Sequence, residues 1–422
     1  MFLDTIRVMY FLLINKPDVI FVDNDNFVKL IANILLLKDF DKIIKIVIIG
    51  EDKLPSVKLN SLESILNYNF DKAEIDEFSC EKNDLMEIAI MTFCSRAMFY
   101  SGRAKVPYVA FISPSNQQTP VMFSDTVGLW YGSLYWNHGP LLTVRAILSY
   151  VTVIKSRVFS EENLYKTIEK YKVTWVFLNE TFNQLFKTND LSFSRYNISS
   201  LKEFLFDDWE VEIFVLKKFI SSLPNVSIIR VYGTAETGVI AYQTDNFSRR
   251  FRGRVTKNVQ LLFVAKKNYP NIHPKLKFIY CKTPHISNTH VSTESAVHLW
   301  YSIGDVGFHI KDEIYVIDHY RHFYTYKNKP VRFLRSEIAL RLHPAVSDVV
   351  VIAVPNAIDD HLVAYVNKIP GKKVTKEQLK RILQKLPELH QLFPIDDFRF
   401  ITHDFPRLPN GKIDRTRIHM LN

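Results

Sequence analysis

Short apolar runs rich in β-branched residues alternate along the chain with segments of helical periodicity. The apolar runs lie at residues 43–50, 173–179, 226–233 and 347–355. Between them, residues 160–171 and 211–224 place apolar side chains at the spacing of an amphipathic helix, and Ser160 is a good helix N-cap. Strands that alternate with helices are typical of layered α/β folds with parallel sheets. The pattern therefore predicts an α/β domain.

The start of the chain predicts a helix followed by a strand. Residues 4–15 read as a helix, a Lys-Pro turn follows, and residues 18–22 form an apolar β-type run. Asp4 and Arg7 interrupt the apolar start. We therefore expect neither a transmembrane segment nor a signal peptide there.

The C-terminal part of the chain has a different order of elements. A β-rich run at residues 312–326 is followed by a strand at 348–354 and a helix at 375–386. A segment of this length can fold as a small domain of its own. We predict a large α/β domain over residues 1–317 and a small α+β domain over residues 318–422.

Composition narrows the classes of function. The hydrophobic fraction of 47% and the charged fraction of 23% are ordinary for a globular protein. The three cysteines (Cys80, Cys94 and Cys281) show no paired spacing, which indicates a reducing compartment and no zinc site. Only 12 of the 422 residues are glycine, so the chain has few glycines from which a glycine-rich phosphate loop could form.

The net charge of +10 comes from one stretch of the chain, residues 246–293, which contains no acidic residue. Its ten basic residues are Arg249, Arg250, Arg252, Arg254, Lys257, Lys266, Lys267, Lys275, Lys277 and Lys282. Such a stretch can face nucleic acid, membrane phosphates or a phosphorylated cofactor, or it can be a solvated face of a sheet. No nucleic-acid-binding motif accompanies it, and we expect no nucleic-acid partner.

Two short motifs contain residues that could bind a nucleotide. The sequence Val-Tyr-Gly-Thr-Ala-Glu-Thr-Gly at residues 231–238 can place an aromatic ring, a tight turn and a metal-binding carboxylate together, or it can be an ordinary turn at a strand end. Asp305 follows Gly304 and suits hydrogen bonding to a ribose diol, with an Asx turn as the alternative.

A polar turn near the end of the chain carries Lys412. Asn410 and Gly411 tolerate positive φ angles, and prolines at 406 and 409 stiffen the approach. A lysine on such a tip can be held toward an anion, or it can simply be solvated.

The order of these motifs resembles the adenylate-forming superfamily of acyl- and aryl-CoA synthetases, adenylation domains and beetle luciferases. The resemblance rests on Tyr-Gly-x-x-Glu at 232–236, Gly-Asp at 304–305, Asp318 with Arg321, the run at 342–355 and the turn at 406–415. The segments 132–139, 170–179 and 217–238 are similar to the luciferase-like and 4-coumarate–CoA ligase-like branch.

The resemblance implies a large N-terminal domain with a β-barrel portion and a small C-terminal lid domain. It implies that a carboxylic acid, fatty or aryl, reacts with Mg²⁺-bound ATP to give an acyl-adenylate, from which coenzyme A then displaces AMP. The segment 132–139 and the region before Tyr232 would line part of the acid pocket. A monomer is expected, in the peroxisome or the cytosol, although the chain ends in His-Met-Leu-Asn rather than a peroxisomal Ser-Lys-Leu signal.

The resemblance also implies roles for individual residues. Lys412 and Glu236 match the catalytic positions, with Glu236 binding Mg²⁺, and Arg321 matches the hinge. The residues expected to bind the nucleotide and its phosphates are Ser101, Gly102, Lys105, Tyr232, Gly233, Thr234 and Asp305.

Several positions depart from the family pattern. Residues 97–100 are Ala-Met-Phe-Tyr where the family's phosphate loop has small and hydroxyl residues, and Ala235 replaces a threonine. The other departures are Asp207 and Asp208 at a glycine pair, His319 at an arginine, Thr325 at a lysine and Asn328 at a glycine. Met1 aligns inside the family's N-terminal domain, so we expect that domain to be incomplete at its start.

These departures leave two functions open. One is an ATP-dependent carboxylate–CoA ligase with impaired catalysis. The other is a pseudoenzyme of the same fold that binds a nucleotide, an acyl ligand or a protein without turnover.

Overall fold

The structure is a computed structural model of the 422-residue chain. The described residues are 12–13, 15–23, 26, 28, 30–31, 34, 44–49, 60–69, 71, 73, 84–93, 103–112, 125–131, 139–155, 160–179, 195–207, 213–234, 236–247, 251–266, 275–286, 300–320, 324–326, 329–331, 333–341, 343–354, 361–384, 395–406, 413 and 415–420. Among them, no helix is long and apolar enough to cross a membrane.

The chain divides into two compact units, one built mainly from residues 1–83 and one that begins at residue 84. The first contains a sheet in which β1 (Val19–Asp23) and β3 (Asn60–Ser61) pair in parallel with β2 (Lys45–Ile49). The short helix α3 (Leu62–Leu66) follows, capped by Ser61. The strands predicted at 18–22 and 43–50 are confirmed, whereas most of the predicted helix at 4–15 lies outside the described residues.

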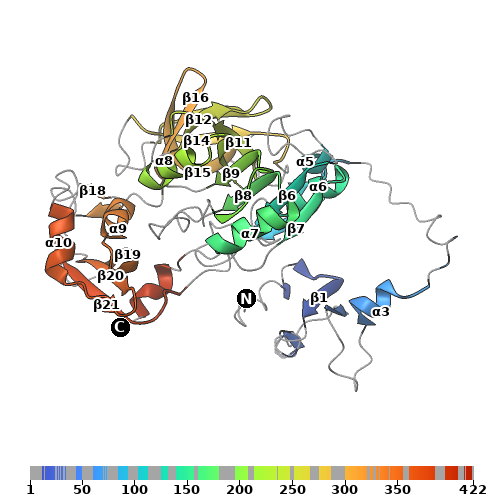
Figure 1. The fold of residues 1–422 in the computed structure, drawn as a ribbon, viewed down its shortest axis with the longest axis horizontal. Coiled ribbons are helices and arrows are strands. Elements are labelled where there is room, and N and C mark those ends of the chain that lie inside the picture. The colour runs from blue at the N-terminus through green and yellow to red at the C-terminus, as the bar shows by residue number, and fades with distance from the viewer. Residues whose placement is uncertain are drawn as a thin grey trace. The chain divides into compact units, whose positions relative to one another are not determined.

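The second unit is built on an eleven-stranded sheet whose first half is parallel (Figure 1). Its strands lie in the order β7-β6-β8-β9-β10. Their bounds are β6 (Val127–Trp130), β7 (Thr152–Lys155), β8 (Trp175–Asn179), β9 (Glu203–Asp207) and β10 (Ser227–Thr234). The predicted parallel α/β architecture is confirmed.

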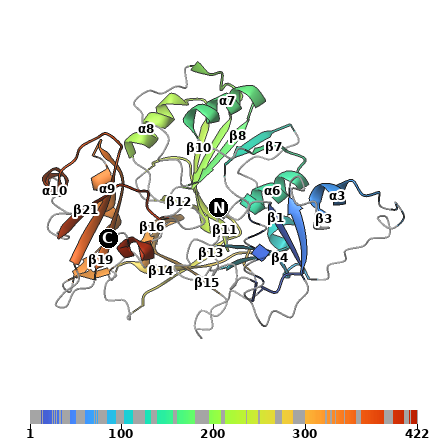
Figure 2. The same cartoon turned by 90° about the horizontal axis from the view of Figure 1, so that it is seen from below.

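Helices cover both faces of this parallel half. α7 (Glu161–Tyr171) and α8 (Ile213–Ser222) lie beside the parallel strands in Figure 2. They contribute Leu164 and Phe219 to one apolar cluster with β8 and β9. α6 (Gly139–Leu148) contributes Leu142 to the cluster on the opposite face. The side chain of Ser160 accepts from the backbone N–H of Asn163, which confirms the predicted N-cap.

The order of the parallel strands creates a switch point between β6 and β8. After β6 the chain crosses to β7 at the edge, and after β7 it returns to β8 on the other side of β6. The connecting helix α6 and the following helix α7 lie on opposite faces. In open α/β sheets, ligands bind beyond the carboxyl ends of the strands at such a point.

The second half of the sheet is antiparallel and continues from β10 without a break. Its strands follow in the order β11-β12-β16-β15-β14-β13. Their bounds are β11 (Gly238–Gln243), β12 (Arg252–Val255), β13 (Gln260–Val264), β14 (Lys277–Lys282), β15 (Tyr301–Ile310) and β16 (Glu313–His319). The described strands form no closed barrel here, so the expected β-barrel portion is corrected to an antiparallel extension of the main sheet.

Two small sheets accompany the main one. β4 (Ile88–Phe93) pairs antiparallel with β5 (Arg103–Pro107), and the short helix α5 (Val109–Ile112) follows. β17 (Tyr324–Tyr326) pairs antiparallel with β18 (Lys329–Val331), inside the segment predicted to be rich in β structure.

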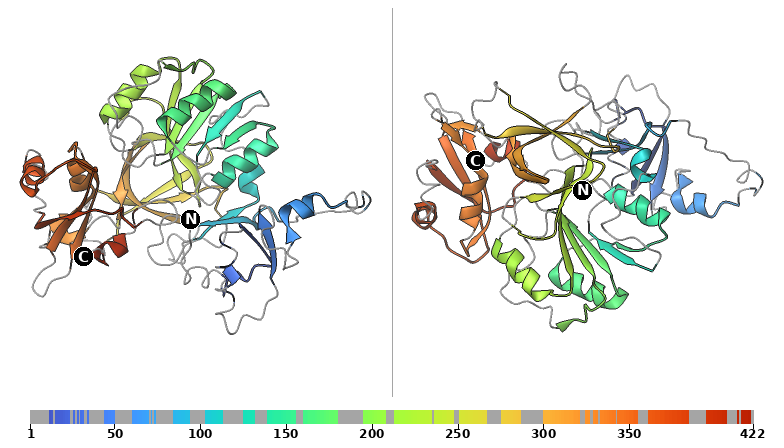
Figure 3. Two further views of the ribbon diagram at one scale, coloured as in Figure 1. Left: turned by 60° about the horizontal axis from the view of Figure 1, so that its bottom comes forward. Right: turned by 90° about the horizontal axis from the view of Figure 1, so that it is seen from above.

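The C-terminal residues form a separate three-stranded sheet with its own core (Figure 3). β20 (His361–Lys368) lies between β19 (Val346–Val354) and β21 (Asp397–Ile401). The helices are α9 (Phe333–Arg341), α10 (Lys376–Gln384) and the terminal 3₁₀ helix η5 (Arg415–Met420). The predicted small α+β fold is confirmed, and its boundary at residues 317/318 stays a prediction.

One buried carboxylate links three elements of this C-terminal fold. Glu337 of α9 is 0% exposed and bonds with both terminal nitrogens of Arg415 in η5. Burial alone would raise the pKa of Glu337. The charge and hydrogen bonds of Arg415, the charge of Arg341 and the backbone N–H of Val351 outweigh burial and hold this pKa below its ordinary value.

This arrangement predicts an acid-sensitive contribution to stability. A carboxyl whose pKa is lower in the folded state stabilises the fold above its unfolded-chain pKa of about 4.3, and this contribution is lost as pH falls through the lower folded-state value. We expect Glu337→Gln to reduce the unfolding free energy by about 3 to 5 kcal/mol at pH 7 and to flatten its decline below about pH 4.3. Denaturant titrations at several pH values measure both effects.

Asp404→Asn is the control, because Asp404 is an exposed carboxylate of the same fold. A Glu337→Gln protein with the wild-type pH dependence would contradict the assignment of this acid-sensitive contribution to Glu337.

Candidate functional site

The end of β10 and its turn into β11 bring together several of the predicted site residues. The pairing of β10 with β11 shifts in register between Tyr232 and Gly233. A side chain at Gly233 would overlap the backbone carbonyl of Gly238, so the two backbones approach too closely for any other residue. This close approach fixes the direction in which the turn leaves the sheet.

Threonine hydroxyl groups stabilise the turn through hydrogen bonds to its backbone. The backbone N–H of Thr234 donates to the Thr237 hydroxyl at 3.1 Å, and that hydroxyl donates to the carbonyl of Gly238 at 3.0 Å. The hydroxyl of Thr283 donates to the carbonyl of Thr237 at 3.2 Å. The sequence predicted Thr234 as a site residue but not Thr283, because nothing near Thr283 in the sequence signals a contact 46 residues away.

Tyr232 and Asp305 meet at the centre of this region. The phenol of Tyr232 donates to Asp305 Oδ2 at 2.6 Å, and the two residues are 5% exposed each. Tyr232 is near the end of β10 and Asp305 is in β15, 73 residues further along the chain. A short bond between a hydroxyl and a carboxylate is among the stronger hydrogen bonds in proteins. Two residues predicted separately for nucleotide binding therefore form one buried unit.

His319 lies across the strand pair from Asp305. The two residues are register partners in β15 and β16, and the backbone N–H of His319 donates to Asp318 Oδ1 at 2.8 Å. Gly304 has a φ of +81°, and a side chain there would overlap the imidazole of His319. Gly304 and Asp305 therefore lie within strand β15 and not in the Asx turn that was the alternative, and His319 is the strand neighbour of Asp305.

Glu236, the predicted magnesium ligand, is 2% exposed in the turn between β10 and β11. In the described part of the chain, no group of three or more acidic, histidine or cysteine side chains could hold a metal ion. Mg²⁺ is commonly held by one or two carboxylates together with substrate phosphates and water. A single carboxylate at this turn fits that mode of binding.

The other predicted site residues lie in a different sheet or outside the described residues. Lys105 lies on β5, in a different sheet from Tyr232 and Asp305, and is partly buried. Ser101, Gly102, Arg321 and Lys412 lie outside the described residues, so their roles stay predictions.

Aromatic and basic side chains lie together on the parallel strands: Trp130 and Lys155 end β6 and β7, and Trp175 begins β8. The indole rings of Trp130 and Trp175 stack with centroids 5.6 Å apart, and Lys155 Nζ lies 5.8 Å from the Trp130 ring. Burial lowers the pKa of Lys155, and burial raises the pKa of Tyr131 to about 12. Of the predicted acid-pocket segment 132–139, only Gly139 is described, as the first residue of α6.

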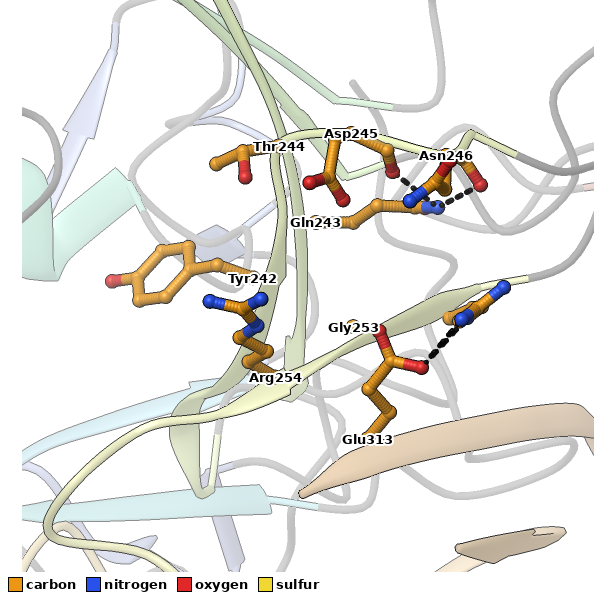
Figure 4. A pocket seen from close by; sticks show the side chains of 9 residues that line it. Tyr242, Gln243, Thr244, Asp245, Asn246, Gly253, Arg254 and Glu313 are labelled. Atoms are coloured by element: carbon orange, nitrogen blue, oxygen red, sulfur yellow. Dashed lines mark hydrogen bonds and ion pairs between the residues drawn. The ribbon is translucent and has the colours of Figure 1, made fainter. Parts of the chain in front are cut away.

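A small polar pocket lies among β11, β12 and β16 (Figure 4). Arg252 Nε donates to Glu313 Oε2 at 2.8 Å on one side, and Gln243 Nε2 donates to the carbonyls of Asp245 and Asn246 on the other. Its lining residues are Tyr242, Gln243, Thr244, Asp245, Asn246, Arg252, Gly253, Arg254 and Glu313. None of the predicted nucleotide-binding residues is among them.

The basic stretch at 246–293 is partly neutralised or packed in the structure. The ion pair with Glu313 lowers the charge that Arg252 presents to a ligand. Lys266 Nζ lies over the rings of Phe278 and Tyr280 at 5.4 and 5.5 Å. Arg254, Lys257, Lys277 and Lys282 are exposed. These contacts favour a solvated, largely structural face over a single anion-binding patch.

The curated proteins most similar in sequence that are given below are named as CoA ligases. No protein-family model matches the chain. "4-coumarate--CoA ligase-like 9" of Arabidopsis thaliana is 24% identical over 387 residues, which cover 86% of this chain and 67% of that protein. "Peroxisomal OPC-8:0-CoA ligase 1" of the same organism is 24% identical over 280 residues, covering 63% of this chain and 50% of that protein. The chain spans about half the length of most of the curated relatives it matches.

Solved structures share the fold at low identity. O-succinylbenzoate coenzyme A synthetase from Bacillus subtilis, in complex with ATP and magnesium, matches with a TM-score of 0.75 and 14% identity, covering 99% of this chain and 82% of that one. The luciferase-like enzyme of the nonluminescent mealworm Zophobas morio matches with a TM-score of 0.61 and 20% identity, covering 76% of each chain. These likenesses show a common fold.

The Tyr232–Asp305 unit predicts a measurable stability effect. Tyr232→Phe keeps the ring and deletes the donor to a buried carboxylate, and we expect it to lower the unfolding free energy by about 1.5 to 3 kcal/mol. Denaturant unfolding at pH 7 measures the change. Tyr171→Phe is the control, because that ring is 44% exposed. Equal effects of the two substitutions would contradict the importance of the Tyr232 hydroxyl.

Proposed function

We propose that the chain is a member of the adenylate-forming superfamily and acts as an ATP-dependent carboxylate–CoA ligase. The observation that carries the proposal is the buried hydrogen bond between Tyr232 and Asp305. It joins two positions, far apart in sequence, that are predicted to bind the nucleotide, next to the turn that holds Glu236. A relative named as a 4-coumarate–CoA ligase-like protein over 86% of the chain supports the reaction class.

The proposed nucleotide site uses each of these residues differently. Asp305 accepts hydrogen bonds from the ribose hydroxyls, and the ring of Tyr232 lies beside the adenine. Gly233 and Thr234 form the strand end that approaches the nucleotide. Glu236 helps to hold Mg²⁺, which would neutralise phosphate charge. Ser101, Gly102 and Lys105 serve the phosphates.

The proposed reaction has two steps at one site. A carboxylate oxygen of the acid attacks the α-phosphorus of ATP, and the bond to the departing pyrophosphate breaks. The ammonium of Lys412 stabilises the charge that develops there. The sulfur of coenzyme A then attacks the carbonyl carbon of the acyl-adenylate, and AMP leaves. Movement of residues 318–422 about Arg321 would exchange the groups needed for the two steps.

We propose a fatty or aryl acid as the carboxylate substrate. The relatives include a ligase named as peroxisomal, which supports a peroxisomal location, with the cytosol as the alternative. We propose a monomer as the working unit.

A second candidate is a catalytically inactive member of the same fold. The observation that favours it is the sequence Ala-Met-Phe-Tyr at residues 97–100, whose bulk opposes close approach of backbone N–H groups to phosphates. Such a protein would bind a nucleotide, an acyl ligand or a protein partner without forming an acyl-adenylate.

Calorimetric titration of the purified full chain with Mg²⁺-ATP tests the nucleotide site without a choice of acid. We expect one site per chain, and we expect Asp305→Ala to weaken ATP binding roughly 10- to 100-fold through loss of charge-assisted hydrogen bonds. Asp305→Asn keeps the shape of the buried side chain and should weaken binding less. Asp312→Ala, an exposed carboxylate in the adjoining turn, is the matched control.

ATP binding by folded Asp305→Ala and Asp305→Asn proteins at wild-type strength would contradict the assigned role of Asp305. A folded wild-type protein that does not bind Mg²⁺-ATP would contradict the proposed ligase. ATP binding without acyl-adenylate formation across a broad acid panel would favour the inactive alternative.

A further inference from the structure

The segment that follows β14 packs against the turn that carries Glu236. β15, β16 and β12 lie between β14 and β11 in the order of the sheet, so the antiparallel half bends far enough to bring the end of β14 to the β10–β11 turn. The hydroxyl of Thr283 donates to the carbonyl of Thr237 at 3.2 Å and accepts from the backbone N–H of His285 at 3.0 Å. Ile286 anchors the segment, because it is buried in an apolar cluster with residues of β10 and β11.

The imidazole of His285 lies against the same turn. Gly238 has a φ of +62°, and a Cβ atom there would lie 3.2 Å from both Cγ and Nδ1 of His285. The left-handed conformation and this close contact both favour glycine at position 238. The turn is therefore held from the β14 side at two successive residues, by a hydroxyl group at Thr237 and by a ring at Gly238.

Two threonines inside the turn add further contacts. The backbone N–H of Thr237 donates to the Thr234 hydroxyl at 3.3 Å, and the backbone N–H of Thr234 donates to the Thr237 hydroxyl at 3.1 Å. The Thr237 hydroxyl itself donates to the carbonyl of Gly238 at 3.0 Å. Glu236 lies between Thr234 and Thr237 in the sequence, so the backbone is held on both sides of it.

A carboxylate with so little contact with water needs this restraint. Glu236 is 2% exposed, and Thr237, Thr283 and His285 are buried as well. Because a buried carboxylate loses hydration, an unrestrained turn would lower its free energy by swinging the side chain of Glu236 into water. The contacts to the turn oppose that movement. Outer hydrogen-bond partners that orient a metal ligand commonly change metal affinity about 10- to 100-fold when they are lost.

We propose that Thr283 and His285 are positioning residues that hold the β10–β11 turn so that Glu236 is oriented to bind Mg²⁺. The proposal rests on the proposed function, in which Glu236 helps to hold the Mg²⁺ that accompanies ATP. Neither positioning residue touches the metal ion or the nucleotide in this account. Their effect passes through the backbone of Thr237 and Gly238.

The test compares ATP binding by the purified full-length Thr283→Val protein with and without Mg²⁺, measured by calorimetry. Valine keeps the shape of threonine and removes the hydroxyl group. With Mg²⁺ present, we expect Thr283→Val to weaken ATP binding about 10-fold, and with Mg²⁺ removed by EDTA we expect binding within about twofold of wild type. Thr283→Ser keeps the hydroxyl group and should restore Mg²⁺-ATP binding to within about twofold of wild type. In a Glu236→Gln background, Thr283→Val should have no further effect.

Thr174→Val is the matched control. The hydroxyl of Thr174 donates to the carbonyl of Val127 at 3.1 Å and accepts from the backbone N–H of the same residue at 2.9 Å, so it makes the same two kinds of bond as the Thr283 hydroxyl. These bonds lie at the amino ends of β6 and β8, whereas the β10–β11 turn follows the carboxyl end of β10. We expect Thr174→Val to bind Mg²⁺-ATP like the wild type.

Three results would overturn the proposal: wild-type Mg²⁺-ATP binding by Thr283→Val, equal weakening with and without Mg²⁺, and equal weakening by Thr174→Val. If Thr283→Val does not fold, His285→Ala removes the ring that lies against Gly238, and the same comparison applies. A folded wild-type protein that binds no ATP would overturn the proposed function and this inference together. Mg²⁺-dependent binding that Thr283→Val leaves intact would overturn the inference alone.

Hydrogen exchange gives a readout that needs neither ATP nor a metal ion. We expect Thr283→Val to speed amide exchange in peptides covering residues 233–239, because the backbone N–H groups of Thr234 and Thr237 are hydrogen-bonded within the turn. Peptides from β8 should exchange as in the wild type. Unchanged exchange at residues 233–239 would overturn positioning of the turn by Thr283.

Discussion

Strand β10 lies between two strands that run in opposite directions, and the candidate site depends on how β10 pairs with each of them. It pairs in parallel with β9 and antiparallel with β11. Residues 228–232 are buried, so the strand cannot slip by one residue without moving its apolar side chains to the wrong face. The pairing of β10 with β9 ends at Arg230. The shift in register after Tyr232 and the close approach at Gly233 follow, where β10 pairs with β11 alone. The candidate site therefore lies where the parallel half of the sheet meets the antiparallel half.

The continuity of the sheet explains how residues far apart in sequence meet. The antiparallel strands return through β15, which brings Asp305 to the phenol of Tyr232, with His319 as its partner on β16. An adenylate-forming enzyme needs a ribose contact, an aromatic surface and a metal-binding carboxylate in one place. In this chain, Asp305, Tyr232 and Glu236 provide candidates for these parts on one sheet and its adjoining turn, whereas the phosphate and lysine positions come from other segments.

Local patterns in the sequence predicted the elements well and the long-range contacts poorly. Periodicity identified α7 and β10, and Ser160 marked the start of α7, because these signals depend on neighbouring residues. The motif at 231–238 identified Tyr232 and Glu236 as candidates through a family resemblance. The bond between Tyr232 and Asp305 and the pairing of Glu337 with Arg415 span 73 and 78 residues, and nothing local encodes them. The β-barrel portion that the family resemblance implied is not closed among the described strands, because pairing between strands far apart in the sequence leaves no local signal.

The measurement that tests the central claim most directly is acid-dependent exchange of radioactive pyrophosphate into ATP by the purified full chain. It reports the reversible formation of an acyl-adenylate and is independent of coenzyme A. The account predicts exchange with at least one fatty or aryl acid, and its loss in Lys412→Ala. Absence of exchange with every acid, in a folded protein that binds Mg²⁺-ATP, would contradict the ligase and leave an inactive relative of the same fold.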